Sequence, residues 1–366
     1  LRNVNADFIL AIGELGKEKG IDPELLFQAV EEALVTAYKK NFGSNQNVRV
    51  DMNKVTGELH IYAQRHIVAE VGDDPNEISL EEARKIDPRY EVDDIVETEV
   101  TPRNFGRIAA QNAKQVVVQR IREAERGMVF EKFSSRENDI VTGIIQRMEN
   151  KNVYIDLGKA EAILTPNEQI PGEIYQYHDR MKTYIVEVKK TSKGPQIMVS
   201  RTHPGLLKRL FELEVPEIHD GLVEIKSVAR EPGMRSKISV YTKDENIDAV
   251  GACVGHKGMR VQTIVNELRG EKIDIVKYSS EPDQYVANAL SPAKVVSTEV
   301  LEEEKICRVI VPDYQLSLAI GKEGQNARLA AKLTGWKIDI KSESQAAEEA
   351  EQGAQEVGVA YEADED

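Results

Sequence analysis

Two short loops in the second half of the chain combine paired glycines with basic side chains. They are Gly255-His256-Lys257-Gly258 and Gly321-Lys322-Glu323-Gly324, and each joins two runs with helical spacing. Paired glycines let the backbone turn sharply and leave no Cβ to hold off an anion. The amides that open the following helix attract phosphate, and Arg260 and Arg328 add charge nearby. These residue types predict phosphate contacts at both loops.

A glycine pair at this spacing is a weak signal on its own. The chain has 24 glycines in 366 residues, so about 1.6 matches are expected by chance, as for any short motif. Gly13 and Gly16 form a third match, which we interpret as incidental. The alternative for the two later loops is a plain helix–turn–helix with glycine caps. Their occurrence in one repeated frame favours phosphate binding.

The two loops belong to an internal repeat, which we place at residues 203–277 and 278–344. Gly255 precedes Ile273 by 18 residues, and Gly321 precedes Ile338 by 17. Each copy also has two β-like segments upstream of its loop, so both have the order strand, strand, helix, glycine loop, helix, strand. The join near 278–282 is short and has no flexible linker, which predicts a fixed relative orientation.

Residues 133–202 have short β-like segments and frequent turns. The segments lie at 141–145, 153–157, 161–164, 183–189 and 196–200. Five short strands at this spacing predict a small closed barrel of the oligonucleotide-binding class. Tyr154, Tyr177 and His178 are candidates for base stacking, although tyrosine is also common in barrel cores. Arg201, directly after the last strand, is a candidate phosphate contact.

Residues 1–132 predict a mixed α/β domain with a long exit helix. Helical spacing covers 7–42, where Asp22 and Pro23 supply an N-cap and a first-turn proline. Strands follow at 48–51 and 58–63, and then a short helix opens with Ser79 and Glu82 as a capping box. A long helical pattern with one apolar side runs from 104 to 126.

The formal charge of −15 is unevenly distributed along the chain. Residues 1–132 have a net charge of −6, 133–202 of +1, 203–341 of −1 and 342–366 of −9. The central segments can therefore hold local basic surfaces, which matter more for phosphate binding than the average charge. The final segment has nine acids and no Lys or Arg. That composition predicts a disordered acidic tail at 345–366.

Several features bear on the compartment. No apolar run approaches the roughly 18 residues of a membrane-spanning helix, and the N-terminus lacks the apolar core of a signal peptide. Cys253 and Cys307 are far apart and form no CxxC motif, which argues against a disulfide framework or a thiolate zinc site. We expect a cytoplasmic protein without membrane contact, cofactor or metal. Nothing demands more than a monomer.

The motifs of the whole chain also resemble a known family. The most specific stretches are Asn104–Gln111, Val228–Gly233 and Leu316–Ile340. The repeats resemble KH modules, in which such a loop clamps the backbone of single-stranded nucleic acid, and the barrel resembles an S1 domain. The order of mixed N-terminal domain, S1, KH and KH is similar, over residues 5–341, to the NusA family of bacterial transcription elongation factors.

The resemblance implies a multidomain α+β protein with no catalytic activity. In that family the N-terminal domain docks on RNA polymerase near the RNA exit channel, and the S1 and KH modules form a continuous surface for emerging transcript. Its members prolong hairpin-dependent pauses, modulate intrinsic termination and join antitermination complexes with other elongation factors. By resemblance, residues 255–258 and 321–324 contact RNA. Glu323 is an acid in such a loop, so either its side chain points away or the second loop is the weaker clamp.

The sequence also bears on two other functions, those of an enzyme and of an RNA-binding scaffold. An enzyme is disfavoured because the chain has no Walker-type loop, no HExxH and no G-x-S-x-G. Polynucleotide phosphorylase also combines S1 and KH modules, but residues 1–132 are too few for its phosphorolytic core. A translation or RNA-decay scaffold would bind RNA but not polymerase. The two functions are distinguished by what residues 1–132 bind. Their acidic surface and long helix suit a protein partner better than RNA.

The acidic tail has two interpretations. In the first, it mimics RNA and lowers non-specific binding by competing for the KH surface. In the second, it is a solvated segment that aids solubility. Some members of the family carry further C-terminal repeats for other partners, and this sequence has the acidic segment in that place.

Overall fold

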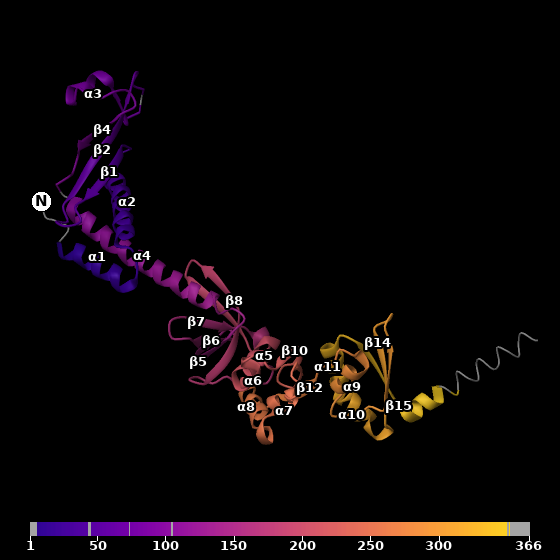
Figure 1. Ribbon diagram of the computed structural model, residues 1–366. Helices are drawn as coiled ribbons and strands as arrows, with labels where there is room; N and C mark the ends of the chain where they lie inside the picture. Colours follow the sequence, from indigo (N-terminus) through magenta and orange to yellow (C-terminus); the bar gives the residue numbers. More distant parts are fainter. Residues whose placement is uncertain (1–5, 43–44, 73, 104, 350, 352–366) are drawn as a thin grey trace, which may run out of the picture. The chain divides into compact units, whose positions relative to one another are not determined.

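The computed structural model describes residues 6–42, 45–72, 74–103, 105–349 and 351. The chain divides into two compact units, residues 1–131 and 132–366 (Figure 1). The predicted helix start at Asn104 and most of the predicted tail lie outside the described residues. None of the described helices is both long and apolar enough to cross a membrane.

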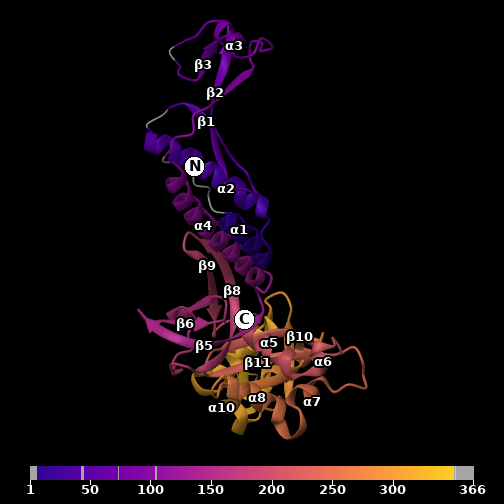
Figure 2. The same cartoon turned by 90° about the vertical axis from the view of Figure 1, so that its left-hand side faces the viewer.

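The first unit packs helices against a small sheet. Its helices are α1 (Ala6–Lys19), α2 (Pro23–Phe42), α3 (Leu80–Ile86) and the long α4 (Phe105–Ser134), and its strands are β1 (Asn47–Met52), β2 (Leu59–Val68), β3 (Glu77–Ser79) and β4 (Ile95–Glu99). Strand β2 pairs with the other three. Its first half joins the core of α1, α2 and α4, and its far end carries β3 and α3 (Figure 2).

Local signals in the first unit are confirmed. The Asp22 carboxylate accepts the Glu24 amide at 2.9 Å, and the Ser79 hydroxyl accepts the Glu82 amide at 3.3 Å. Helix α4 runs to Ser134 and therefore passes the predicted end at 126. Gly127 weakens a helix by about 1 kcal/mol, but the burial of Phe133 near the end of α4 compensates for it.

The second unit begins with a closed five-stranded barrel, as predicted. Its strands are β5 (Ile140–Glu149), β6 (Asn152–Asp156), β7 (Glu161–Leu164), β8 (Arg180–Thr191) and β9 (Gly194–Ser200). They close in the order β5-β6-β7-β9-β8. Alternate side chains fill the interior, among them Ile145, Ile155 and Ile185, all fully buried. This alternation of buried and exposed residues is what a small filled barrel requires.

Two repeat units follow the barrel, and we call them the first and second repeat units. The first contains α5 (Pro204–Glu214), α6 (Pro216–His219), β10 (Glu224–Glu231), β11 (Arg235–Tyr241), α7 (Ala249–Val254), α8 (Met259–Glu267) and β12 (Lys272–Lys277). The second contains α9 (Pro282–Ala289), β13 (Ser297–Leu301), β14 (Ile306–Val311), α10 (Leu316–Ile320), α11 (Gln325–Thr334) and β15 (Lys337–Ser342). In each sheet the first two strands are antiparallel and the last pair is parallel.

Hydrophobic cores run across the joins inside the second unit. Tyr184 of the barrel packs with Leu207 and other residues of the first repeat unit in one cluster. Ala229 and Val276 of the first repeat unit pack with Val286 and other residues of the second. The short join near 278–282 thus lies beside a packed interface, in agreement with the prediction that no flexible linker separates the repeats.

The start of the predicted tail differs from the prediction. Residues 343–349 are helical and follow β15 directly (the yellow helix in Figure 1). The Ser344 hydroxyl donates to Asp313 Oδ1 at 2.6 Å, and Gln345 Oε1 accepts the Ser342 amide at 3.1 Å. These two side-chain bonds, one of them to a residue 31 positions earlier, open a helix where composition alone predicted disorder.

Candidate nucleic-acid interface

The two glycine loops have the same backbone conformation. Their first glycines have φ and ψ of 75° and 175° at Gly255 and of 77° and 170° at Gly321. The third positions, Lys257 and Glu323, are both left-handed, with φ of 51° and 53°. The last glycines are left-handed as well. The sequence repeat therefore extends to the torsion angles. The combination of positive φ and extended ψ at Gly255 and Gly321 is open only to glycine, whereas the left-handed third position also accepts Lys257 and Glu323.

The two glycines of each loop have different surroundings. A Cβ on Gly255 would lie 2.7 Å from Arg260 Cγ, and a Cβ on Gly321 would lie 2.8 Å from Asn326 Cβ. A Cβ on Gly258 or Gly324 would meet no atom within 4 Å. The first glycine thus lets the loop pack on the helix behind it. The second leaves open surface where a sugar–phosphate backbone can approach.

The helix starts beside these loops favour anions. Helices α8 and α11 each begin directly after the last loop glycine, and neither has a side-chain N-cap. Their first amides therefore lack an internal acceptor, which suits them to a phosphate oxygen. His256, Lys257 and Lys322 are exposed on these loops. Glu323, also exposed, has the backbone conformation of Lys257 with the opposite charge.

Arg260 is engaged in holding the first loop. Its Nη1 donates to the Ala252 carbonyl at 2.6 Å and pairs with Glu217 at 2.9 Å. Asn326, at the equivalent position of the second loop, donates to the Ala319 carbonyl at 3.0 Å. Both side chains satisfy carbonyls at the end of the helix before the loop, which would otherwise lack donors. The contacts of Arg260 in the structure therefore position the loop. Direct contact of Arg260 with RNA stays a prediction.

Arg328 joins the second loop to the first repeat unit. Its Nε donates to Glu231 Oε1 at 2.6 Å, and its Nη1 donates to the Glu323 carbonyl at 3.1 Å. Gln325 donates to the other Glu231 oxygen at 2.8 Å. The hydrogen bond from Arg328 lowers the pKa of Glu231 below its usual value, and this effect outweighs burial, which would raise that pKa. The last residue of β10 thus holds the start of α11, the helix that follows the second loop. RNA contact by Arg328 stays a prediction.

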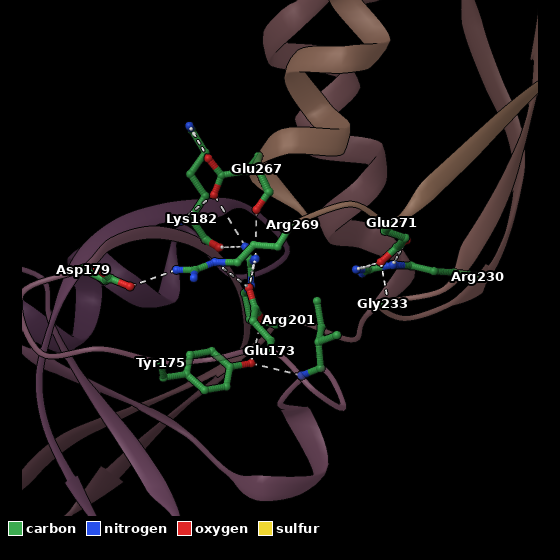
Figure 3. A network of polar contacts seen from close by, with 11 residues as sticks. Glu173, Tyr175, Asp179, Lys182, Arg201, Arg230, Gly233, Glu267, Arg269 and Glu271 are labelled. Atoms are coloured by element: carbon green, nitrogen blue, oxygen red, sulfur yellow. Dashed lines mark hydrogen bonds and ion pairs between the residues drawn. The ribbon is translucent and has the colours of Figure 1, made fainter.

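Arg201 is not available to phosphate, so that interpretation is wrong. Its side chain is 1% exposed and pairs with the equally buried Glu173. Its remaining donors reach the Lys182 and Glu267 carbonyls, at 2.9 and 3.0 Å (Figure 3). The donors of Arg201 are thus bonded to acceptors inside the protein, as a buried charge requires. The role of Arg201 is therefore to hold the fold together.

The Arg201 network fixes helix α8 from its far end. Glu267 is the last residue of α8 and pairs with Lys182 of β8 at 3.1 Å. Arg269, just beyond α8, pairs with Asp179 at 3.0 Å (Figure 3). The first glycine loop lies at the opposite end of the same nine-residue helix. The barrel therefore positions the first loop through α8, as the first repeat unit positions the second loop through α11.

A second buried ion pair braces the first repeat unit. Arg230 and Glu271 have fully buried side chains and are joined by two hydrogen bonds of 2.8 and 2.9 Å. Arg230 also donates to the His203 carbonyl at 2.8 Å. Figure 3 shows the pair together with the Gly233 amide, which donates to Glu271 at 2.9 Å. Burial would raise the pKa of Glu271, but its bonds to Arg230 and neighbouring donors lower it on balance.

The aromatic candidates are dispersed on the barrel. Tyr154 lies on β6, and the Arg147 guanidinium carbon is 4.0 Å from its ring centroid. Tyr177 is 62% exposed in the loop before β8 and contacts His178, with ring centroids 3.8 Å apart. Tyr177 is therefore the ring best exposed for stacking, while Tyr154 already has a cation over it. None of the three fills the barrel interior.

The structure reveals functional residues that no sequence motif marks individually. Glu173, Glu231, Glu267 and Asn326 hold the two loop helices in place, as described above. The sequence carries one signal for them, because Arg230 and Glu231 lie in the specific stretch Val228–Gly233. Glu173 and Glu267 have no comparable motif. Among the described residues there is no cluster of His, Cys, Asp or Glu able to hold a metal ion.

Family models match four consecutive parts of the chain. They are described as the NusA N-terminal domain for residues 7–127, the S1 RNA binding domain for 134–200, the NusA-like first KH domain for 201–278 and the NusA-like second KH domain for 282–348. Together they cover nearly all of the described residues.

Curated relatives match over almost the whole length. The transcription termination/antitermination protein NusA of Halalkalibacterium halodurans is 65% identical over 345 residues, 94% of this chain and 90% of its own. The protein of the same name from Bacillus subtilis is 64% identical, over 94% of this chain and 93% of its own. The solution structure of the N-terminal domain of NusA from B. subtilis is 55% identical and covers 33% of this chain and 98% of that one, with a TM-score of 0.31.

Replacing Lys257 with Asn is expected to weaken binding of single-stranded RNA. Asn tolerates the left-handed backbone at this position, so only the charge is lost. The salt dependence, the slope of log K against log salt concentration, should become shallower by about 0.7 for one lost phosphate contact. Fluorescence anisotropy with a labelled RNA over a salt series measures both. Lys305→Asn, at an exposed lysine of similar φ outside the loops, is the control, and an equal effect there would contradict the prediction.

Replacing Glu323 with Lys is expected to tighten RNA binding. Lys257 already adopts the same backbone conformation, so the new side chain adds no strain and turns a repulsive charge into an attractive one. The matched control is Glu304→Lys, which makes the same change of net charge at an exposed site between β13 and β14. Equal affinities of the two variants would show that the Glu323 side chain points away from the RNA.

Replacing Arg201 with Met is expected to destabilise the second unit by about 3–5 kcal/mol, because the buried Glu173 would lose its main partner and keep only Arg269 at 3.5 Å and the Tyr175 hydroxyl. Arg308→Met removes an exposed pairing with Glu299 and should cost no more than about 1 kcal/mol. Urea unfolding followed by the fluorescence of Trp336, the one tryptophan in the sequence, gives both values. Unchanged stability together with weaker RNA binding would restore Arg201 as a phosphate contact.

Proposed function

The chain belongs to the NusA family of transcription termination/antitermination proteins, and from this membership we propose that it ties nascent RNA to RNA polymerase. The family consists of transcription regulators with RNA-binding S1 and KH domains, not enzymes. In this proposal residues 1–132 bind the polymerase, and residues 133–202, 203–277 and 278–344 hold single-stranded RNA in the bacterial cytoplasm.

The observation that carries the RNA-binding part is the matched geometry of the two glycine loops. Each loop presents an open glycine, at least one exposed basic side chain and an uncapped helix start. Such a loop can grip the sugar–phosphate backbone without reading the bases, as KH modules do. Because the loop helices are held by neighbouring modules, two contacts of fixed spacing are available to one RNA strand.

Sequence charge and family membership support the polymerase-binding part. Residues 1–132 carry a net charge of −6, which disfavours RNA as their main partner. The model of the NusA N-terminal domain matches residues 7–127. A separate compact unit with its own core can dock on a protein while the second unit binds RNA.

Joining these two activities explains how a protein without catalytic groups can change transcription. When one chain binds both the polymerase and its transcript, the second contact becomes intramolecular and gains a high effective concentration. RNA held in an extended single-stranded form near the exit site folds differently from free RNA. The protein therefore alters whether and when hairpins form, and this acts on pausing, termination and antitermination, together with other elongation factors.

A single-round transcription assay on a hairpin-pause template tests the proposal. The full chain should lengthen the pause, and residues 132–366 alone, which form a separate compact unit, should bind RNA but leave the pause unchanged. Residues 1–131 should retain core RNA polymerase in a pull-down. If neither protein alters the pause while both bind RNA, the chain is an RNA-binding scaffold and the polymerase contact is wrong.

A further inference from the structure

The approach to the second glycine loop carries exposed apolar side chains. Tyr314 lies in the short turn Asp313–Gln315 that precedes α10, and it is 81% exposed. Leu318 and Ile320 of α10 are 46% and 37% exposed, and Ile320 directly precedes Gly321. Exposed apolar residues that occur singly need no explanation, but a group of them so close together indicates a binding surface.

The fold fixes the backbone on both sides of Tyr314 but does not use its ring. The Asp313 carboxylate accepts the Ser344 hydroxyl at 2.6 Å. The Gln315 side chain accepts the Lys294 amide. The largely exposed ring between these two contacts is therefore presented to solvent from a fixed position.

The first repeat unit lacks this apolar surface. When the two glycine loops are aligned, Asp248 takes the position of Tyr314 and Ala252 takes the position of Leu318. A carboxylate and a methyl group offer a base neither a ring nor a large apolar area. The exposed tyrosine is therefore a feature of the second repeat unit alone.

The charges of the two loops differ in the opposite direction. Lys257 of the first loop corresponds to Glu323 of the second, and Glu323 offsets the charge of Lys322. A loop without net charge gains little affinity from the release of counterions. Stacking of a base on an aromatic ring does not depend on such charge. The second repeat unit thus has the contact that its loop charge does not supply.

We propose that Tyr314, with Leu318 beside it, is a stacking platform for one base of the RNA strand whose backbone lies on the second glycine loop. This assignment rests on the proposed binding of RNA by the loops. The two residues are four positions apart, the spacing that places side chains on one side of a helical segment. Tyr314 precedes Gly321 by seven residues, about 11 Å at the rise of a helix, so a nucleotide next to the clamped backbone can place its base on the ring.

Fluorescence anisotropy with labelled single-stranded RNA tests the platform in the full chain. Tyr314→Ala should weaken binding about fivefold to 150-fold, the range for the loss of one stacked base. The slope of log K against log salt concentration should stay the same, because no phosphate contact is lost. Tyr314→Phe keeps the ring and should bind as the unaltered chain does.

Val55→Ala, at an 82% exposed site of the first unit, is the control and should leave the affinity unchanged. The urea transition followed by Trp336 fluorescence should be the same for Tyr314→Ala and the unaltered chain, because the ring is exposed. A set of RNAs that each lack one base then locates the contact. Removal of one particular base should weaken binding to the unaltered chain but not to Tyr314→Ala, since both changes remove the same interaction.

The possible results separate this proposal from the proposed function. If Tyr314→Ala binds RNA as tightly as the unaltered chain, the stacking platform is wrong while RNA binding by the loops stands. If Tyr314→Ala shortens the transcriptional pause without a change in RNA affinity, the ring contacts a protein, and the platform is again wrong. An unaltered chain that binds no single-stranded RNA would overturn the proposed function itself, and the platform with it.

Discussion

The RNA-binding surface depends on contacts by which each module fixes a helix of the module that follows it. Each of these helices begins directly after a glycine loop. The barrel holds the end of α8 through Arg201, Glu173 and Glu267, and the first repeat unit holds the start of α11 through Glu231. A flexible string of modules would lose conformational freedom whenever RNA engaged two of them. Fixing the modules in advance removes that cost from binding.

Charged groups make these contacts, and at the barrel their burial explains why they specify one arrangement. Burying an ion pair gains little net stability, but breaking one leaves a buried charge and costs several kcal/mol, about 3–5 in typical cases. Arg201 with Glu173 and Arg230 with Glu271 are almost fully buried. A shifted packing of barrel and repeat would break the bonds that cross the join, from Arg201 to the Glu267 carbonyl and from Arg269 to Glu173 and Asp179. Such a shift would leave the buried Arg201 and Glu173 with fewer partners, so it is disfavoured even where the apolar contacts could adapt.

The repeat reuses one backbone design with different charges. Both loops have the same torsion angles, but Glu323 stands where Lys257 does. Arg260 and Asn326 likewise perform one task, the satisfaction of carbonyls before the loop, with different side chains. The shared backbone geometry needs positive φ at the first and last loop positions, and both loops have glycine there, which adopts such angles without steric cost. Charge is free to differ, so we infer that the two loops hold RNA with unequal strength.

The sequence by itself determined the element order, the closed barrel, the two repeats and their loops, because periodicity, caps and glycine spacing are local signals. The tertiary structure decided what the arginines do. Arg201 follows a strand and carries a charge, so sequence could not distinguish a phosphate contact from a buried pair. Its partner Glu173 is 28 residues away and Glu267 is 66 residues away. The same limit applied to residues 343–349, whose helix depends on Asp313, 31 residues before Ser344. Pairing across such separations is set by packing, which leaves no periodic trace in the sequence.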